Sequence, residues 1–464
     1  MRKKRLLLLM LGAISLASMA QQPPISHLEI NNVFPTILGD GSCFVPQQRI
    51  YYEEWDAYHY NCTTWEVPSG SGKETIYQHS LWFGGLDANE DLHLAALRFG
   101  QGYDLNGGRD YWSGPLKTAD GTIDQMTSLK YHHIWSITRV EIEQFIANHG
   151  NTGYQTPEDI LTWPAHGDDG CASNLAPFVD VNNDGRYNPA DGDYPDIKGD
   201  QCLFFIFNDS FNEHTESGGE KIGLEVHAMV YAFDALNDEA LNNTVFVNYK
   251  FYNRSTNDYH NTYLGLWTDW DLGCQWDDYV GCDVQRNSCF VYNGTSVDGN
   301  GEPWAYGDNH PVQVLTVLNG PDNLGLTGFM YHYNDYSSMG DPHTAFDYYM
   351  LLQSYWKDGN HLQYGGSGYP EWGSPVGPEC NYIFPGLTDP DHQDFDWTEE
   401  TAGNVPGDRR GLASVGPFDF PAGGMKELDY AMITVWKNNS QSAFERKGEF
   451  IDHVRELFNN GFEK

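Results

Sequence analysis

One twelve-residue segment has the side chains and the spacing of a calcium-binding loop. It reads DVNNDGRYNPAD from Asp180 to Asp191 and matches the pattern D-x-[DN]-x-[DN]-G. Calcium takes about six to eight oxygen ligands, and alternate residues of a tight loop direct their oxygens inward. The predicted ligands are the side chains of five residues and one carbonyl, namely Asp180, Asn182, Asp184, Asn188 and Asp191 with the carbonyl of Arg186.

The surroundings of this loop differ from those of a calcium sensor. Gly185 occupies the sharp turn, but the last ligand is Asp191, whose side chain is shorter than the glutamate usual there. Pro177 and Pro195 flank the segment and disfavour the long helices of an EF-hand. We therefore expect a structural calcium site among strands and turns. The alternative is a loop of Asx turns that binds water instead.

A second acidic group is a weaker candidate for a cation site. Asp269 and Asp271 are two residues apart in an apparent strand, so their side chains share one face. Three further carboxylates follow closely, at Asp277, Asp278 and Asp283. The alternative is an acidic rim that is simply solvated.

Signatures of catalysis are absent from the sequence. There is no G-x-S-x-G elbow and no H-E-x-x-H helix, and GSGKE at 70–74 lacks the residues of a phosphate-binding loop. No catalytic or cofactor-binding residue is therefore predicted. A pair of carboxylates for glycoside cleavage is defined by distance rather than by sequence, so a carbohydrate-active enzyme stays open as an alternative.

The composition restricts the class of partner. The 464 residues include 65 acidic and 26 basic side chains, which gives a formal net charge of −39. Nucleic acids and anionic membranes attract clustered lysine and arginine, so neither is an expected partner. Hydrophobic residues make up 40% of the chain, which is enough for a large core and argues against disorder.

The N-terminus has the pattern of a secretory signal. Residues 2–5 are basic, residues 6–16 are apolar, and Ser-Met-Ala at 18–20 provides a cleavage site before Gln21. No later segment reads as a transmembrane helix. The sequence thus predicts a signal peptide over 1–20 and an exported protein that is secreted or at the cell surface, with the periplasm as a further location.

Eight cysteines are compatible with an oxidising compartment. The first expectation is local disulfide formation among Cys274, Cys282 and Cys289, and between Cys171 and Cys202. The alternative is that some cysteines are free, buried thiols.

The pattern of apolar residues predicts a mainly β fold. Alternating and β-branched runs, such as 224–233 and 244–252, are typical of strands in a β-sandwich. A small helical insertion is expected over about 136–163, where Thr138 and Glu141 form a capping box, and a C-terminal helix over about 442–459. We expect a β-rich region over 21–215 with the insertion and the calcium loop, and a sandwich-like region over 216–464.

Several short motifs resemble those of a family of large exported Bacteroidota proteins. They are LEINNV at 28–33, VPSGSGK at 67–73, LWFGGLD at 81–87, YWSGPL at 111–116, WPAHG at 163–167, the calcium loop with GDYP at 192–195, HTE at 214–216, DRR at 408–410 and SVGPF at 414–418. Such proteins usually carry a type IX secretion sorting domain or a gliding-motility-associated tail, and their biochemical function is generally unassigned. From the 464 residues we expect no such domain after the last predicted helix, and attachment to the surface by that route is not expected.

The resemblance implies a compartment and an architecture rather than a reaction. We therefore expect an exported, calcium-stabilised binding or structural protein with a glycan or protein ligand. A carbohydrate-active enzyme or sugar-binding module is the alternative.

Overall fold

The computed structural model describes residues 23–43, 65–98, 108–370 and 377–462, except for the side chains of Ser42 and Cys43. The predicted signal peptide over 1–20 lies outside the described residues.

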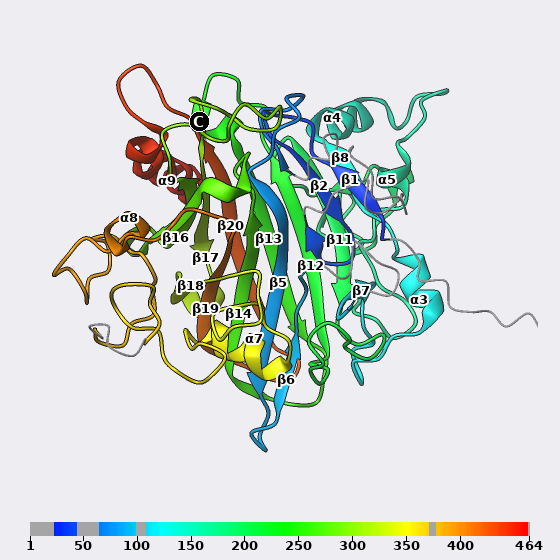
Figure 1. The fold of residues 1–464 in the computed structure, drawn as a ribbon. Coiled ribbons are helices and arrows are strands. Elements are labelled where there is room, and N and C mark those ends of the chain that lie inside the picture. The colour runs from blue at the N-terminus through cyan, green and yellow to red at the C-terminus, as the bar shows by residue number, and fades with distance from the viewer. Residues whose placement is uncertain (1–22, 44–64, 99–107, 371–376, 463–464) are drawn as a thin grey trace, which may run out of the picture.

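Two nine-stranded antiparallel sheets pack face to face and form a β-sandwich (Figure 1). Sheet 1 has the order β1 (Ile25–His27), β2 (Phe34–Leu38), β3 (Ser42–Cys43), β5 (Ile76–Leu86), β14 (Tyr259–Trp270), β19 (Arg409–Phe420) and β18 (Gly328–His332), with β4 (Trp65–Glu66) beside β2 and β6 (Leu92–Ala95) beside β5. The mainly β class predicted from the sequence is confirmed.

Sheet 2 lies behind sheet 1 in Figure 1. Its order is β15 (Asp278–Asp283), β16 (Ser288–Asn293), β17 (Val312–Asn319), β20 (Met425–Val435), β13 (Thr244–Asn253), β12 (Leu224–Ala232), β11 (Gln201–Asn208) and β7 (Trp112–Ser113), with β8 (Trp135–Thr138) beside β11. Each sheet contains strands from both sides of residue 215, where the sequence suggested a boundary between two regions. A separate short ribbon pairs β9 (Phe178–Val179) with β10 (Tyr194–Pro195).

Helices lie on the outer faces and at the edges of the sandwich. They are α3 (Gln125–Lys130), α4 (Arg139–Asn148), α5 (Glu158–Leu161), α6 (Glu239–Asn242), α7 (Ala345–Leu352), α8 (Glu399–Ala402) and α9 (Ala443–Asn459). α4 and α5, which form the predicted insertion, and the C-terminal α9 pack on sheet 2, where Phe145 and Ile451 join a second core with Phe204. α7 packs on sheet 1, and its Tyr348 ring meets Trp82 edge-on at 4.6 Å between centroids.

The helix starts follow from local capping. Thr138 accepts a hydrogen bond from the Glu141 backbone, and Glu141 bonds back to the backbone of Thr138, as the sequence predicted. Ser442 and Glu445 form the same reciprocal cap on α9. Each cap satisfies backbone donors that a helix start would otherwise leave unpaired.

The core between the sheets contains one buried histidine that joins them. His79 on β5 is fully buried; its Nδ1 lies 3.0 Å from the Thr268 hydroxyl of sheet 1, and its Nε2 lies 2.9 Å from the Tyr430 hydroxyl of sheet 2. Burial lowers the pKa of His79 to about 3, because a charged imidazolium would lose its hydration there. The imidazole is therefore neutral in the folded protein at neutral pH.

This neutral histidine predicts a loss of stability in mild acid. Below about pH 6.5 the unfolded chain takes up a proton on His79 that the folded chain does not, so the free energy of unfolding falls as the pH falls. Between about pH 7 and about pH 5 this group should remove about 2 kcal/mol. Denaturant unfolding at both pH values measures the loss.

The variant His79→Gln should be less stable at neutral pH but should lose less stability on acidification than the native chain. His343→Gln is the control, because His343 is exposed and its ring stacks on that of Tyr336, and it should leave the pH dependence unchanged. An unaltered pH dependence in His79→Gln would contradict the assignment.

Candidate metal centre

A row of polar side chains crosses the outer face of sheet 1. The strand register places Asp269 of β14 directly between Gln78 of β5 and Arg410 of β19, and Arg410 opposite His332 of β18. All four side chains are buried. A buried polar row of this kind is expensive unless its members pair with one another, so it marks a candidate site.

The alternation along β14 directs these groups outward. Thr268 faces the core, where it meets His79, so its neighbours Trp267 and Asp269 face the other side. Trp267 stacks on Trp82 in this outer layer, with ring centroids 6.1 Å apart. The same alternation carries Asp271, just past the end of β14, toward the side of Asp269, as the sequence predicted.

Asp269 and Asp271 meet a third carboxylate, Asp408. The three offer oxygens that all lie within 4.8 Å of one another and could hold a metal ion. Asp408 immediately precedes β19. Because β14 and β19 are antiparallel, the end of one strand lies beside the start of the other, which brings Asp271 and Asp408 together.

Negative charge exceeds positive charge in this three-carboxylate cluster. The guanidinium of Arg410 lies 3.5 Å from Asp269 and 3.2 Å from Asp408. The neighbouring Arg409 is already bound by Glu399 through two nitrogens, at 3.1 and 2.9 Å. Among the described residues, the Arg410 guanidinium thus pairs with two of the three carboxylates, and a cation held by all three would add positive charge where the acidic groups gather.

The pKa of Asp271 reflects this excess. Burial, followed by the charges of Asp269, Glu74 and Asp408, raises the pKa of Asp271 well above its usual value. A carboxyl group with a raised pKa is one that a cation stabilises in its ionised form. All three ligands offer oxygen only, and oxygen donors suit hard cations such as calcium.

The other end of the polar row is balanced. His332 Nδ1 lies 3.1 Å from Asp341, and Arg98 lies 3.1 Å from the second oxygen of Asp341. Although burial raises the pKa of Asp341, His332 and Arg98 lower it below its usual value. The described carboxylates therefore gather at the end of the row that holds the three-carboxylate cluster, whereas Asp341 lies between a histidine and an arginine.

The predicted calcium loop forms a tight turn on the surface. Gly185 has a φ of 76°, a conformation that glycine adopts at little cost. Asp180 accepts hydrogen bonds from the backbone of Asp184 at 3.2 Å and of Gly185 at 2.7 Å, and Asp184 accepts one from Arg186. These bonds fix the carboxylates of the first and fifth loop positions on the inside of the turn.

The ends of this loop are held by Asp193. Its buried carboxylate accepts hydrogen bonds from the backbone of Val181 and of Asn188, both at 2.8 Å. The amide of Asn188 bonds in turn to Asp191. The carboxylates of Asp180, Asp184 and Asp191 do not bring three oxygens within 4.8 Å of one another. Calcium binding here stays a prediction.

The other acidic residues of the second predicted group, Asp277, Asp278 and Asp283, do not join Asp269 and Asp271. Asp283 caps the turn after β15 and pairs with Arg286 at 3.0 Å. Asp278 is fully buried at the start of β15, and Asp277 joins Cys274 and Asp298 in a different group. The contribution of Asp408 was missed because 137 residues separate it from Asp271, and only the strand register joins them.

The predicted disulfides are wrong for the cysteines that the structure describes. Six cysteines are free thiols, namely Cys171, Cys202, Cys274, Cys282, Cys289 and Cys380. Cys202 is buried in the core under the helices, whereas Cys171 is partly exposed beside Lys117. Cys282 and Cys289 stand opposite each other on β15 and β16 without a bond between them. The side chain of Cys43 and all of Cys62 lie outside the described residues.

Comparison with known proteins adds no identification. No protein-family model matches the chain, and no curated protein matches it. Within the described parts of the chain, no helix has the length and apolar composition needed to span a bilayer. The arguments about function therefore depend on the residues themselves.

The three-carboxylate cluster predicts opposite effects of one substitution with and without a cation. Without divalent cations, Asp271→Asn removes a repelled charge and should raise the free energy of unfolding by about 1 kcal/mol. With calcium at about one hundred times Kd, the free energy of unfolding of the native chain should rise by about 2.7 kcal/mol for one filled site. In Asp271→Asn this rise should be smaller, because the cluster no longer binds the cation.

Urea unfolding in chelator and in calcium measures both effects. Asp419→Asn is the control, because Asp419 is an exposed carboxylate on the same strand β19, and it should change neither value by more than about 0.5 kcal/mol. Equal calcium stabilisation of the native chain and Asp271→Asn would exclude this cluster as a cation site.

Proposed function

We propose that the chain is an exported, calcium-stabilised protein of the cell surface or the surrounding medium, and that it acts by binding or as a structural component. The observation that carries the proposal is the cluster of Asp269, Asp271 and Asp408, whose carboxylate oxygens all lie within 4.8 Å of one another and could hold a metal ion. A cation that binds only the folded state stabilises it through mass action.

The compartment is part of the proposal. Outside the cell, calcium is plentiful enough to keep a site of about 10⁻⁴ M affinity filled. The predicted signal peptide over 1–20 and the motifs that resemble exported Bacteroidota proteins support this location. The formal net charge of −39 makes a bound cation more favourable still.

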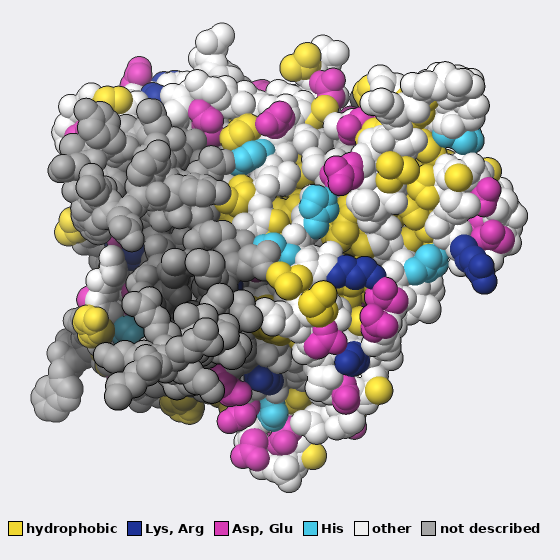
Figure 2. Space-filling view, turned by 90° about the vertical axis from the view of Figure 1, so that its right-hand side faces the viewer, with side chains coloured by type: hydrophobic (Ala, Val, Ile, Leu, Met, Phe, Trp, Pro, Cys, Tyr) yellow, Lys and Arg dark blue, Asp and Glu magenta, His cyan; other side chains and the backbone are white. Residues whose placement is uncertain are grey.

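The surface charge supports a role that does not involve nucleic acid. In the face shown in Figure 2, Asp and Glu side chains are scattered among apolar and uncharged ones, and the few Lys and Arg side chains lie next to them. The described part of this face offers no basic track for a phosphate backbone, in keeping with the formal net charge of −39. It leaves glycans and proteins as the classes of ligand that we propose.

The calcium loop provides the first test. Asp180→Ala combined with Asp184→Ala, made in the Asp271→Asn background, should abolish the remaining rise in Tm on adding calcium. The expected size of that rise is a few degrees for a chain of this length. Thermal unfolding with chelator and with calcium measures it, and Asp196→Ala, an exposed carboxylate just after β10, is the control.

A calcium response of the combined variant equal to that of Asp271→Asn alone would show that the loop is not a calcium site. Because Asp271→Asn is also measured alone, the experiments test the two proposed calcium sites separately.

The alternative function, a sugar-binding module or carbohydrate-active enzyme, is favoured by one specific feature. Trp276 is 67% exposed, and an exposed indole ring can stack on the face of a sugar.

An array of glycans and proteins, probed with the purified chain from residue 21 in calcium, decides between the ligand classes. If glycans are bound, Trp276→Ala should weaken the signal by at least about tenfold, since loss of one stacking aromatic costs on the order of 1–3 kcal/mol. Tyr336→Ala is the control, because Tyr336 is also highly exposed. Protein signals that both variants preserve would favour the protein ligand, and no signal on either array would contradict a binding role.

A further inference from the structure

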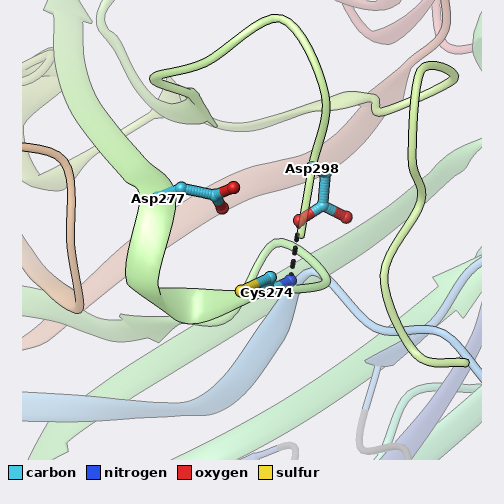
Figure 3. Close-up of side chains that lie close together, drawn as sticks. All are labelled: Cys274, Asp277 and Asp298. Atoms are coloured by element: carbon cyan, nitrogen blue, oxygen red, sulfur yellow. Dashed lines mark hydrogen bonds between the residues drawn. The ribbon is translucent and has the colours of Figure 1, made fainter. Parts of the chain in front are cut away.

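A second group of ligand atoms, chemically different from the first, lies at the end of sheet 2. It consists of the Cys274 sulfur and carboxylate oxygens of Asp277 and Asp298, all within 4.8 Å of one another (Figure 3). Cys274 and Asp298 are buried, and Asp277 is partly buried. A thiol between two carboxylates is an unusual environment, because each carboxylate disfavours loss of the thiol proton unless a cation is present.

Local structure places these three residues together. Cys274 precedes the single turn η3 (Gln275–Asp277), so its side chain and that of Asp277 are three residues apart and lie on the same side. Asp298 comes from the loop between β16 and β17 and accepts hydrogen bonds from the backbone of Cys274, at 2.8 Å, and of Tyr306. Figure 3 shows the Asp298 carboxylate reaching down to Cys274 from a separate segment.

Gly273 makes this approach feasible. Its φ is 69°, and a Cβ at this position would collide with the carboxylate of Asp298. A side chain at 273 would therefore push Asp298 away from Cys274. Glycine at position 273 therefore allows the carboxylate of Asp298 to approach the thiol of Cys274.

Unsatisfied polar atoms surround the group. Asp277 Oδ1 is buried and has no hydrogen-bond partner, while its other oxygen accepts from the backbone of Gly299. Asp278 is fully buried, its Oδ1 also lacks a partner, and its charge interacts with Asp298 and Asp277. Buried carboxylate oxygens without partners are costly, and a bound cation would compensate them.

His310 has the properties of an additional ligand near this group. Its ring hydrogen-bonds to the backbone of Ser296, its Nδ1 is buried without a partner, and its charge interacts with that of Asp277. Metal-binding histidines typically bind the ion with one nitrogen and a backbone or carboxylate group with the other. His310 does not lie within 4.8 Å of all three ligand atoms. Its ring must therefore move to bind the ion directly, whereas contact through a bridging water requires no movement.

We infer that Cys274, Asp277 and Asp298 form a site for a divalent transition metal of the zinc type. A sulfur ligand selects zinc over calcium and magnesium, which take oxygen ligands. Three protein ligands leave a fourth position for water or His310. Binding displaces the proton of the thiol, whose pKa is raised by burial, and joins η3 to the loop that follows β16.

The test uses zinc and cobalt with the full mature chain. The protein is treated with chelator and reductant, loaded with zinc in the presence of excess calcium, and desalted before elemental analysis. We expect one retained zinc per chain that calcium does not displace. Cobalt in place of zinc should give a thiolate-to-cobalt charge-transfer absorption, which reports sulfur ligation directly.

Two variants and one control define the ligands. Cys274→Ser should abolish the cobalt absorption, and Asp277→Asn should weaken zinc binding by at least about tenfold. Asp277→Asn guards against misfolding of the cysteine variant, because its Oδ1 has no partner to lose. Cys171→Ser, which changes a partly exposed thiol elsewhere, should leave both measurements unchanged.

The inference is overturned if the native chain retains no zinc, or if Cys274→Ser and Asp277→Asn retain it with unchanged affinity. These outcomes are independent of the calcium experiments, because neither the calcium loop nor the three-carboxylate cluster shares a ligand with this group.

Discussion

The antiparallel pairing of β14 with β19 is the interaction on which the first candidate metal centre depends. It sets Asp269 opposite Arg410 and brings the residue after one strand, Asp271, beside the residue before the other, Asp408. A register shift of one residue would turn Asp269 toward the apolar core and remove the ion pair. The positions of the charged groups in the cluster are therefore set by strand register. The helices and loops around sheet 1 cover these groups but do not position them.

Much of the fold could be predicted from local patterns. The reciprocal cap of Thr138 and Glu141 and the polar start of the C-terminal helix act within one turn, so the sequence contains the whole interaction. Strand composition likewise indicated a β-sandwich. The order of strands could not be predicted, because pairings such as β13 with β20 join residues nearly two hundred positions apart. The disulfide prediction was wrong because cysteine spacing does not determine where side chains point.

The candidate sites were predictable to different degrees. Alternation along a strand was enough to place Asp269 and Asp271 on one side, but their partner Asp408 became visible only in the structure. The grouping of Cys274 with Asp298 could not be predicted from the sequence. The spacing of Cys274 and Asp277, three residues apart, could have indicated that these two side chains lie together. Sites built within one loop can be recognised from spacing, whereas sites built across strands require the register.

The position of β19 and β20 in the sheets has a consequence for the order of folding. β19 lies between β14 and β18 in one sheet, and β20 lies between β17 and β13 in the other, yet both are among the last strands to leave the ribosome. Sheet 1 cannot close before residue 420 has been synthesised, and sheet 2 cannot close before residue 435, so the strands on either side of each gap expose unpaired edges until then. Folding therefore waits for β19 and β20, and its non-local pairings make it slow. A chain that cannot complete its sheets early exposes strand edges for longer, so it needs protection from aggregation before these two strands are in place.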